Sequence, residues 1–258
     1  MSDDILFEVR ERIGFVTFNR PQARNAMTFA MYERLGEICT SLDPSVQVLI
    51  LRGAGGKAFV SGTDISQFES GFATAQDGLE YEARMDRVFD AIEDVKVPTV
   101  AAIQGACTGG GAGIAAACDL RFGSPSARFG FPIARTVGNC LSMRNTARLA
   151  AMIGVAKTKE LLLLAKLFDA EEMKALGLLS EVVPSEEALL PRVEEVARML
   201  LLHAPLTMRA SKTALNRYIR RLNPGEGDDL IALCYTSRDF KEGVRAFLEK
   251  RKPQWTGK

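Results

Sequence analysis

The chain has 258 residues, enough for one sizeable hydrophobic core in one large domain or in a domain with a helical appendage. Its 33 basic and 32 acidic residues nearly cancel, so no strong overall charge predicts binding to nucleic acid or to an anionic membrane. Five widely spaced cysteines form no CxxC pair, which argues against a disulfide framework or a metal site and predicts a cytoplasmic location. No secretory signal is visible, and the longest apolar runs, such as Leu161–Ala165, are too short to span a bilayer.

The first half of the chain alternates strand-like and helix-like segments, which indicates an α/β class. In chain order we predict a hairpin of Ile5–Arg10 and Gly14–Phe18, a helix from Thr28 to about Leu42, a strand Val46–Leu51, a helix near Gly78–Val95, a strand Thr99–Ile103, a small-residue helix Ala112–Ala117 and a strand Asp119–Phe122.

The second half is mainly helical. Asp169 and Glu172 form the pattern of a capping box, and Gly177 is placed to end that helix. A last short strand is predicted at Leu178–Val183. Helices then dominate from Glu186 onward, with breaks at Ala204-Pro205 and at 223–225.

Three consecutive glycines, Gly109 to Gly111, stand between a predicted buried strand and a helix. Their N–H groups at a positive helix end suit an anion or a developing oxyanion, although glycines here could equally serve close packing of helix on strand. No GK[ST] follows, so this is not a P-loop. A G-x-G-x-x-A match at 111–116 lacks the acidic residue that a dinucleotide fold requires about 20 positions later, because 120–159 contain no Asp or Glu.

Four segments in a specific order and spacing give the chain its resemblance to a known family. They are Asn19-Arg20-Pro21 with Asn25-Ala26; Ala58 to Ile65 (AFVSGTDI); Ala101 to Gly113 followed by Cys118-Asp119; and Asp239 to Gly243 with Ala246-Phe247 and Lys250 to Pro253. Together they make the sequence similar to the crotonase (enoyl-CoA hydratase/isomerase) superfamily.

The resemblance implies an α/β crotonase fold, in which repeated ββα units form a spiral of two near-perpendicular sheets. We accordingly divide the chain into an acyl-CoA-binding core at 1–190 and a helical region at 191–258 that serves oligomerisation and pocket closure. Family members assemble as trimers, often paired into hexamers, so a homotrimer or homohexamer is expected. The resemblance implies no permanently bound cofactor; coenzyme A enters as part of the substrate.

The resemblance also assigns two backbone donors. Thr63 and Gly110 match the positions whose N–H groups bind the thioester carbonyl oxygen and stabilise an enolate there, an effect worth on the order of 10²–10³-fold per donor. The positions expected to line the acyl-CoA site are Arg24, Ala26, Ser61, Thr63, Asp64, Ile65, Ser66, Gly110, Phe247 and Lys250.

Both catalytic glutamates that hydratases of this family use are replaced. The first position is Gly113 and the second, in the F-G-x-P segment, is Ile133; neither can transfer a proton. From 95 to 159 the only carboxylate is Asp119, which we interpret as a structural cap.

Replacement groups must therefore come from elsewhere in the chain. Arg135 could bind an acidic acyl group or a departing carbon dioxide, or could be a solvated loop residue. Glu82 and Asp86 share one helix face of unknown direction, with Tyr81 as a weaker candidate. Asp64 fits a role in shaping its loop, and His203, the only histidine, fits a helix end.

We infer an enzyme that acts on an acyl-CoA through an oxyanion-stabilised thioester enolate. Isomerisation or decarboxylation agrees better than hydration with Gly113 and Ile133. The alternative is a catalytically inert acyl-CoA binder or a partner of an active paralogue.

Overall fold

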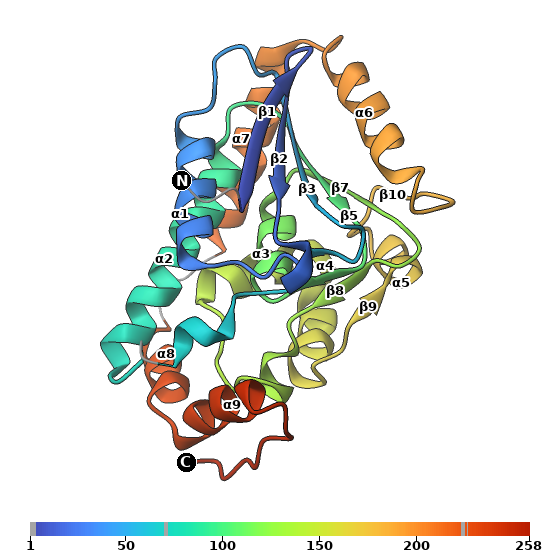
Figure 1. Cartoon of the computed structure of the whole chain (residues 1–258). Helices are drawn as coiled ribbons and strands as arrows, with labels where there is room; N and C mark the ends of the chain where they lie inside the picture. Colours follow the sequence, from blue (N-terminus) through green and yellow to red (C-terminus); the bar gives the residue numbers. More distant parts are fainter. Residues whose placement is uncertain (1–3, 70–71, 223–224, 226) are drawn as a thin grey trace.

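The computed structural model describes residues 4–69, 72–222, 225 and 227–258, which form two mixed sheets surrounded by helices (Figure 1). The larger sheet has the strand order β1-β2-β3-β5-β7-β10, and the smaller has the order β4-β6-β8-β9. The strands of the larger sheet are β1 (Ile5–Arg10), β2 (Ile13–Phe18), β3 (Val48–Gly53), β5 (Thr99–Ile103), β7 (Leu120–Gly123) and β10 (Glu181–Val182). Those of the smaller are β4 (Ala58–Val60), β6 (Ala106–Thr108), β8 (Arg128–Gly130) and β9 (Phe168–Asp169).

The chain winds as a spiral that visits the two sheets in turn. Strands β3, β5 and β7 lie side by side and parallel in the larger sheet, and each is followed by a strand of the smaller one. Those following strands, β4, β6 and β8, are parallel to one another as well. This arrangement is the α/β crotonase spiral that the sequence predicts, with β1 and β9 as the antiparallel members.

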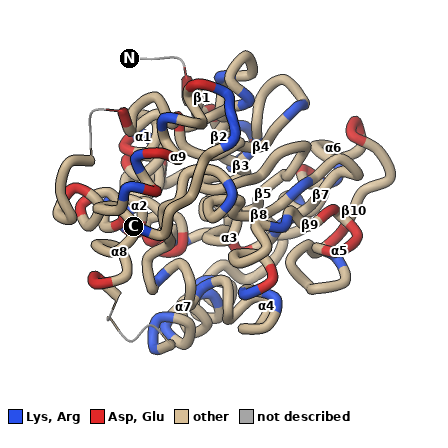
Figure 2. The backbone as a smooth tube through the Cα atoms, turned by 90° about the horizontal axis from the view of Figure 1, so that it is seen from below, with Lys and Arg blue, Asp and Glu red and all other residues tan. Residues whose placement is uncertain are grey.

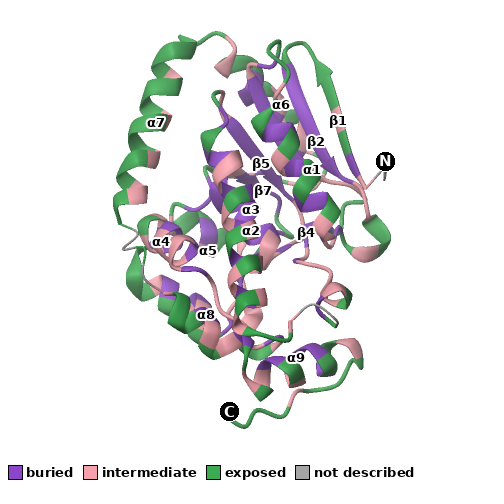
Figure 3. Ribbon diagram, turned by 90° about the vertical axis from the view of Figure 1, so that its left-hand side faces the viewer, coloured by how far each residue is buried: buried purple, intermediate pink, exposed green. Residues whose placement is uncertain are grey.

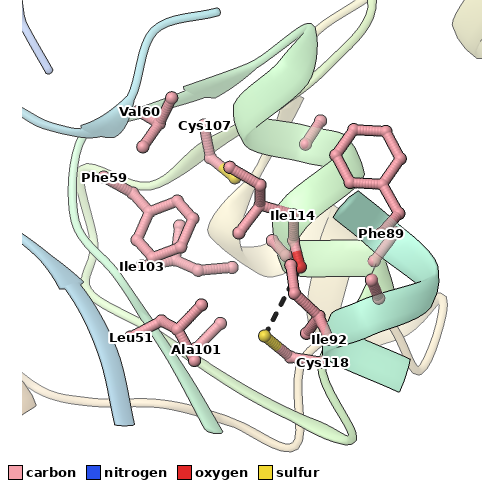
Figure 4. Packing of buried hydrophobic residues seen from close by; sticks show 14 of the residues in the cluster. Leu51, Phe59, Val60, Phe89, Ile92, Ala101, Ile103, Cys107, Ile114 and Cys118 are labelled. Carbon is pink, nitrogen blue, oxygen red and sulfur yellow. Dashed lines mark hydrogen bonds between the residues drawn. The ribbon is translucent and has the colours of Figure 1, made fainter. Parts of the chain in front are cut away.

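The larger sheet is buried on both faces, which explains the continuous apolar run of β3. Val48 and Ile50 pack towards α6 (Leu189–Leu200), whereas Leu49 and Leu51 face the main core. The main core includes the central helix α3 (Gly110–Ala117), whose Ile114 lies beside Phe59 and Ile103 in Figure 4. Helix α2 (Ala75–Asp94) contributes Phe89 and Ile92 to the same core.

Local sequence signals explain where several elements begin and end. The Thr28 hydroxyl accepts a hydrogen bond from Met31 N at 3.2 Å and caps α1 (Phe29–Thr40). The predicted capping box of Asp169 and Glu172 opens α5 (Ala170–Ala175). The strand predicted at Leu178–Val183 is shorter, because the N–H groups of residues 178 and 179 close the end of α5 on Met173 O.

The remaining α-helices come from the second half of the chain and lie in different parts of the molecule, as Figure 3 shows. They are α4 (Met143–Leu163), α7 (Pro205–Arg221), α8 (Asp228–Tyr235) and α9 (Arg238–Leu248), with short 3-10 helices η1 (Pro21–Ala23), η2 (Ile65–Phe68) and η3 (Pro132–Arg135). Pro205 begins α7, as the Ala204-Pro205 break predicts. The second predicted break, at 223–225, includes residues 223 and 224, which lie outside the described residues.

Helix α6 belongs with the core, although the boundary set at residue 190 falls inside it. Its Leu189, Val193 and Val196 pack against the larger sheet. Helices α8 and α9 cover the other end of the molecule, where Tyr235 and Phe240 form a cluster with Phe68. The predicted helical region therefore does two things: it completes the core with α6, and it covers η2 with α8 and α9.

The distribution of charge agrees with the nearly equal numbers of basic and acidic residues. Basic and acidic residues are interspersed over the side seen in Figure 2, without one large field of either sign. Among the described residues, no helix is both long and apolar enough to cross a bilayer.

Candidate active site

The two predicted donor loops meet because they follow neighbouring strands. Strands β4 and β6 pair in parallel, with Val60 opposite Cys107, so the loops after them leave the same edge of the smaller sheet. Gly62 and Gly109 turn these loops at φ values of 114° and 53°, which side chains disfavour. Through Gly62 and Asp64, the first loop is tied to Met27 by two backbone hydrogen bonds of 2.8 Å.

The amides of Thr63 and Gly110 are the predicted donors to a thioester oxygen. Within the described chain, neither N–H group donates to a protein acceptor. Gly110 is the first residue of α3, so its N–H stands at the positive end of the helix. Both residues line the same cavity, where an anionic oxygen could accept from the two groups together.

Two tyrosines hold the Thr63 side chain. Its Oγ1 is 2.9 Å from the hydroxyl of Tyr32 and 2.9 Å from that of Tyr81. Burial raises the pKa of both tyrosines, so both remain neutral hydroxyls. The sequence marks Tyr81 as a weak candidate but gives no reason to select Tyr32, which comes from α1 and is fully buried.

The cavity has a volume of about 240 Å³ and mostly apolar walls. Its lining residues are Ser61, Gly62, Thr63, Ile65, Phe68, Tyr81, Glu82, Met85, Phe89, Thr108, Gly109, Gly110, Phe131, Pro132, Ile133, Thr136, Val137, Asn139, Leu141, Asn145 and Phe247. No Lys, Arg or His lines it among the residues that the structure describes. An apolar acyl chain fits such walls, whereas a carboxylate on the acyl group would find no counter-charge.

Positions 113 and 133 bring no acid to this cavity. Gly113 is buried in α3 beneath the ring of Phe89. Ile133 lines the cavity with an aliphatic side chain. Phe89 itself lines the cavity, so an aromatic ring faces position 113.

Glu82 is the one carboxyl that reaches the cavity among the described residues. It is 3% exposed, and burial raises its pKa to about 8. Its Oε1 accepts a hydrogen bond from the Tyr235 hydroxyl at 2.6 Å, and its Oε2 accepts one from Ser142 N at 3.1 Å. No cation pairs with it in the described part of the chain.

Other sequence candidates have structural partners. Asp86 accepts hydrogen bonds from Ser142 Oγ at 2.7 Å and Asn145 Nδ2 at 3.1 Å, and it does not line the cavity. Asp119 accepts from Thr99 N at 2.7 Å and pairs with Lys212 at 2.7 Å, so it caps a strand as the sequence indicates. His203 is exposed just beyond α6, and its N–H donates to Leu200 O.

The first-loop candidates divide into two groups. Ser61 and Ile65 line the cavity with Thr63. Asp64 pairs with Arg20 at 3.1 Å and accepts from Ser66 Oγ at 2.7 Å, so it shapes its loop. Asp64 and Ser66 are not among the lining residues.

The remaining predicted contacts lie nearer the surface. Phe247 is half-exposed and lines the cavity, where it could cover a ligand that enters. Arg24, Lys250 and Arg135 are exposed and do not line it, and neither does Ala26. Arg135 is therefore not brought beside the Thr63 and Gly110 amides, whereas Arg24 and Lys250 remain available to a ligand that extends outward.

Two further cavity residues, Phe89 and Asn139, and the neighbouring Tyr235 have no distinguishing signal in the sequence. Phe89 and Tyr235 look like ordinary core residues in the sequence. The contact of Tyr235 with Glu82 joins positions 153 apart, so no local pattern predicts it. Asn139 Nδ2 donates to the Tyr235 hydroxyl at 3.2 Å, and its Oδ1 is buried without a partner within the described residues.

Comparison with known proteins decides the family. The enoyl-CoA hydratase/isomerase family model matches residues 8–258. The chain belongs to the enoyl-CoA hydratase/isomerase (crotonase) superfamily. It is 35% identical to a crotonyl-CoA hydratase of Syntrophomonas wolfei over 99% of each chain, and 31% identical to a short-chain-enoyl-CoA hydratase of Clostridium acetobutylicum over 97% of this chain and 96% of that one.

Solved structures of this superfamily share the fold. An enoyl-CoA hydratase from Mycobacterium avium subsp. paratuberculosis aligns with a TM-score of 0.85 at 27% identity, covering 98% of both chains. An enoyl-CoA hydratase/carnitine racemase from Magnetospirillum magneticum aligns at 0.80 with 33% identity, covering 100% of this chain and 97% of that one. The protein is thus an enzyme of a superfamily whose members act on CoA thioesters without a separate cofactor. No group of three or more metal-ligating side chains occurs among the described residues.

Proposed function

We propose that this enzyme moves protons on an acyl-CoA through a thioester enolate and does not hydrate enoyl-CoAs. The observation that carries the proposal is a cavity where the Thr63 and Gly110 amides have no acceptor among the described residues, while positions 113 and 133 hold glycine and isoleucine. Enolate stabilisation needs only the two donors. Hydration also needs a group that activates water and a group that protonates the α-carbon.

Isomerisation of a 3-enoyl-CoA to its conjugated 2-enoyl isomer is the favoured reaction. One base removes the α-proton, the dienolate oxygen accepts hydrogen bonds from Thr63 N and Gly110 N, and the same proton returns to the γ-carbon. Decarboxylation is less well supported, because Arg135 is exposed and no cation lines the cavity among the described residues. The apolar walls favour an uncharged acyl chain.

The coenzyme A part of the substrate would extend outward from the cavity. Phe247 at the mouth, with the exposed Arg24 and Lys250, would meet the adenine and phosphate groups. We place the enzyme in the cytoplasm, because all five cysteines are free thiols.

A trimer or hexamer is part of the proposal. Helix α7 has 17 residues, none of them buried, and exposes the large apolar side chains of Leu215 and Tyr218, which lie three residues apart on one face. Exposed apolar faces of this kind are typical of subunit contacts.

Proton exchange at the α-carbon of butyryl-CoA in deuterated water tests the proposed chemistry. The saturated substrate can neither isomerise nor hydrate, so deuterium uptake reports enolate formation alone. An enzyme with enolate chemistry exchanges the α-proton, whereas an inert acyl-CoA binder, the alternative function, binds the thioester without exchange. Calorimetric titration of the same thioester separates these two results from a failure to bind.

A further inference from the structure

A hydrogen-bonded chain of three side chains, two of them buried, reaches the cavity. Glu82 accepts from the Tyr235 hydroxyl at 2.6 Å, and that hydroxyl accepts from Asn139 Nδ2 at 3.2 Å. Glu82 and Asn139 both line the cavity. The chain joins α2, α8 and the loop before α4, three elements far apart in the sequence.

A buried carboxyl without an ion pair is costly to keep charged and needs a reason to be there. Two other acidic or basic side chains are buried among the described residues, Glu93 and Arg148. They form an ion pair with each other at 2.6 Å. Glu82 instead has neutral donors alone within the described structure, so it can hold a proton or release it without breaking an ion pair.

The hydrogen-bonded chain suits both protonation states of Glu82. When the carboxyl is ionised, Tyr235 donates to it and Asn139 donates to Tyr235, as observed. When the carboxyl is protonated, it can donate to Tyr235, whose hydroxyl then donates to the Asn139 amide oxygen after the amide turns over. That oxygen is one of the buried side-chain atoms that lack a hydrogen-bond partner among the described residues. The polarity of the chain thus reverses as one proton arrives or leaves.

We propose that Glu82 is the catalytic acid/base of this enzyme, with Tyr235 and Asn139 as its positioning residues. The assignment rests on the proposed enolate function. In the forward step the α-carbon–hydrogen bond breaks, the proton passes to the Glu82 carboxylate, and the electron pair becomes the enolate held by Thr63 and Gly110. In the return step Glu82 gives the same proton to the γ-carbon, and no further reactant is consumed.

The surroundings bring the pKa of the Glu82 carboxyl close to neutrality. Burial is the main cause of its pKa of about 8, and the Tyr235 hydrogen bond opposes it. The titratable groups that face it are Asp86 and Tyr81 from α2, Tyr235 and Cys234 from α8, Tyr32 from α1 and Cys140 from the loop before α4. A base with a pKa near the working pH is well matched to proton transfer.

Deuterium exchange into butyryl-CoA with matched variants tests the assignment. Glu82→Gln keeps the shape of the side chain and should lower exchange by about 10²–10⁴-fold, while the Kd for butyryl-CoA changes by less than about threefold. Glu80→Gln makes the same chemical change two residues away, at an exposed site, and should leave exchange unchanged. Glu82→Asp retains a carboxyl and should retain part of the exchange.

The pH profile supplies a readout that a purely structural role would not move. Wild-type exchange should rise with pH as Glu82 ionises, and Tyr235→Phe should shift the midpoint to higher pH because it removes a hydrogen bond to the carboxylate. Exchange by wild type that persists in Glu82→Gln, or a midpoint unmoved in Tyr235→Phe, would overturn the assignment while leaving the enolate function standing. A wild-type enzyme that binds butyryl-CoA but exchanges nothing would overturn the enolate function, and the assignment with it.

Discussion

The α-carbon of Gly113 lies so close to the Phe89 ring that a β-carbon at position 113 would stand 2.5 Å from Phe89 Cζ. The ring comes from α2 and reaches α3 from the side, as Figure 4 shows. The glycine and the phenylalanine are thus complementary, and a carboxylate could not be placed at position 113 without moving the ring.

Gly113→Glu should therefore destabilise the protein and fail to create hydratase activity by itself. We expect a loss of more than about 2 kcal/mol in the free energy of unfolding, from overpacking and from burial of a carboxyl. Adding Phe89→Ala should recover part of that loss by opening the space. Urea unfolding measures both. Gly36→Ala is the control, because a β-carbon there meets only Val88 at 3.9 Å, and equal losses in the two glycine variants would contradict the account.

Gly110→Ala should reduce α-proton exchange by about 10²-fold or more, because the new methyl group would collide with the Tyr32 hydroxyl and displace the donor loop. Tyr32→Phe removes the colliding oxygen, so the double variant should recover part of the exchange. The comparison is made by exchange rate at saturating butyryl-CoA. A double variant no better than Gly110→Ala would show that the collision is not what disables the donor.

The free energy of unfolding should depend on pH because the pKa of Glu82 is raised in the folded state. Below about pH 4.5, folded and unfolded states both keep the proton on this residue. As pH rises towards 8, the unfolded carboxyl ionises while the folded one keeps its proton, so the free energy of unfolding falls across that window. Glu82→Gln cannot ionise at this position. Across this window its free energy of unfolding should therefore rise relative to that of wild type by up to about 1.4 kcal/mol per pH unit. Urea unfolding at several pH values measures the difference, and a constant difference would contradict it.

The protein should be a trimer or hexamer in solution. Light scattering is expected to give about three or six times the 28.2 kDa of one chain. Leu215→Asp, on the exposed apolar face of α7, should lower that mass, whereas Arg209→Asp tests whether charge alone has the same effect. A wild-type mass of one chain at micromolar concentration would contradict the prediction.

Elements whose signals are local could be predicted from the sequence. The hairpin of β1 and β2, the Thr28 cap and strand β5 are as expected, because each depends on neighbouring residues. Helix α1 ends two residues before the predicted Leu42, and β3 begins two residues after the predicted Val46. The strands of the smaller sheet were missed as separate elements, because they have only two or three residues and their pairing is not local.

The donor loops could be predicted for a different reason, since short motifs fix them. Thr63 and Gly110 line one cavity as the family resemblance implies. The direction of Glu82 could not be predicted, because helix periodicity alone does not say what faces the helix. Only the packing of α8 on α2 shows that this side chain meets Tyr235 beside the cavity.

Turnover of two substrates by the wild-type enzyme separates isomerisation from hydration. One is a 3-enoyl-CoA, such as 3-hexenoyl-CoA, whose conversion to the conjugated 2-enoyl isomer requires only one proton-transfer group. The other is crotonyl-CoA, whose hydration requires water to be activated as well. We expect measurable isomerisation, and crotonyl-CoA hydration that is absent or several orders of magnitude slower than by a true hydratase. Rapid hydration of crotonyl-CoA, at hundreds of turnovers per second, would contradict this expectation.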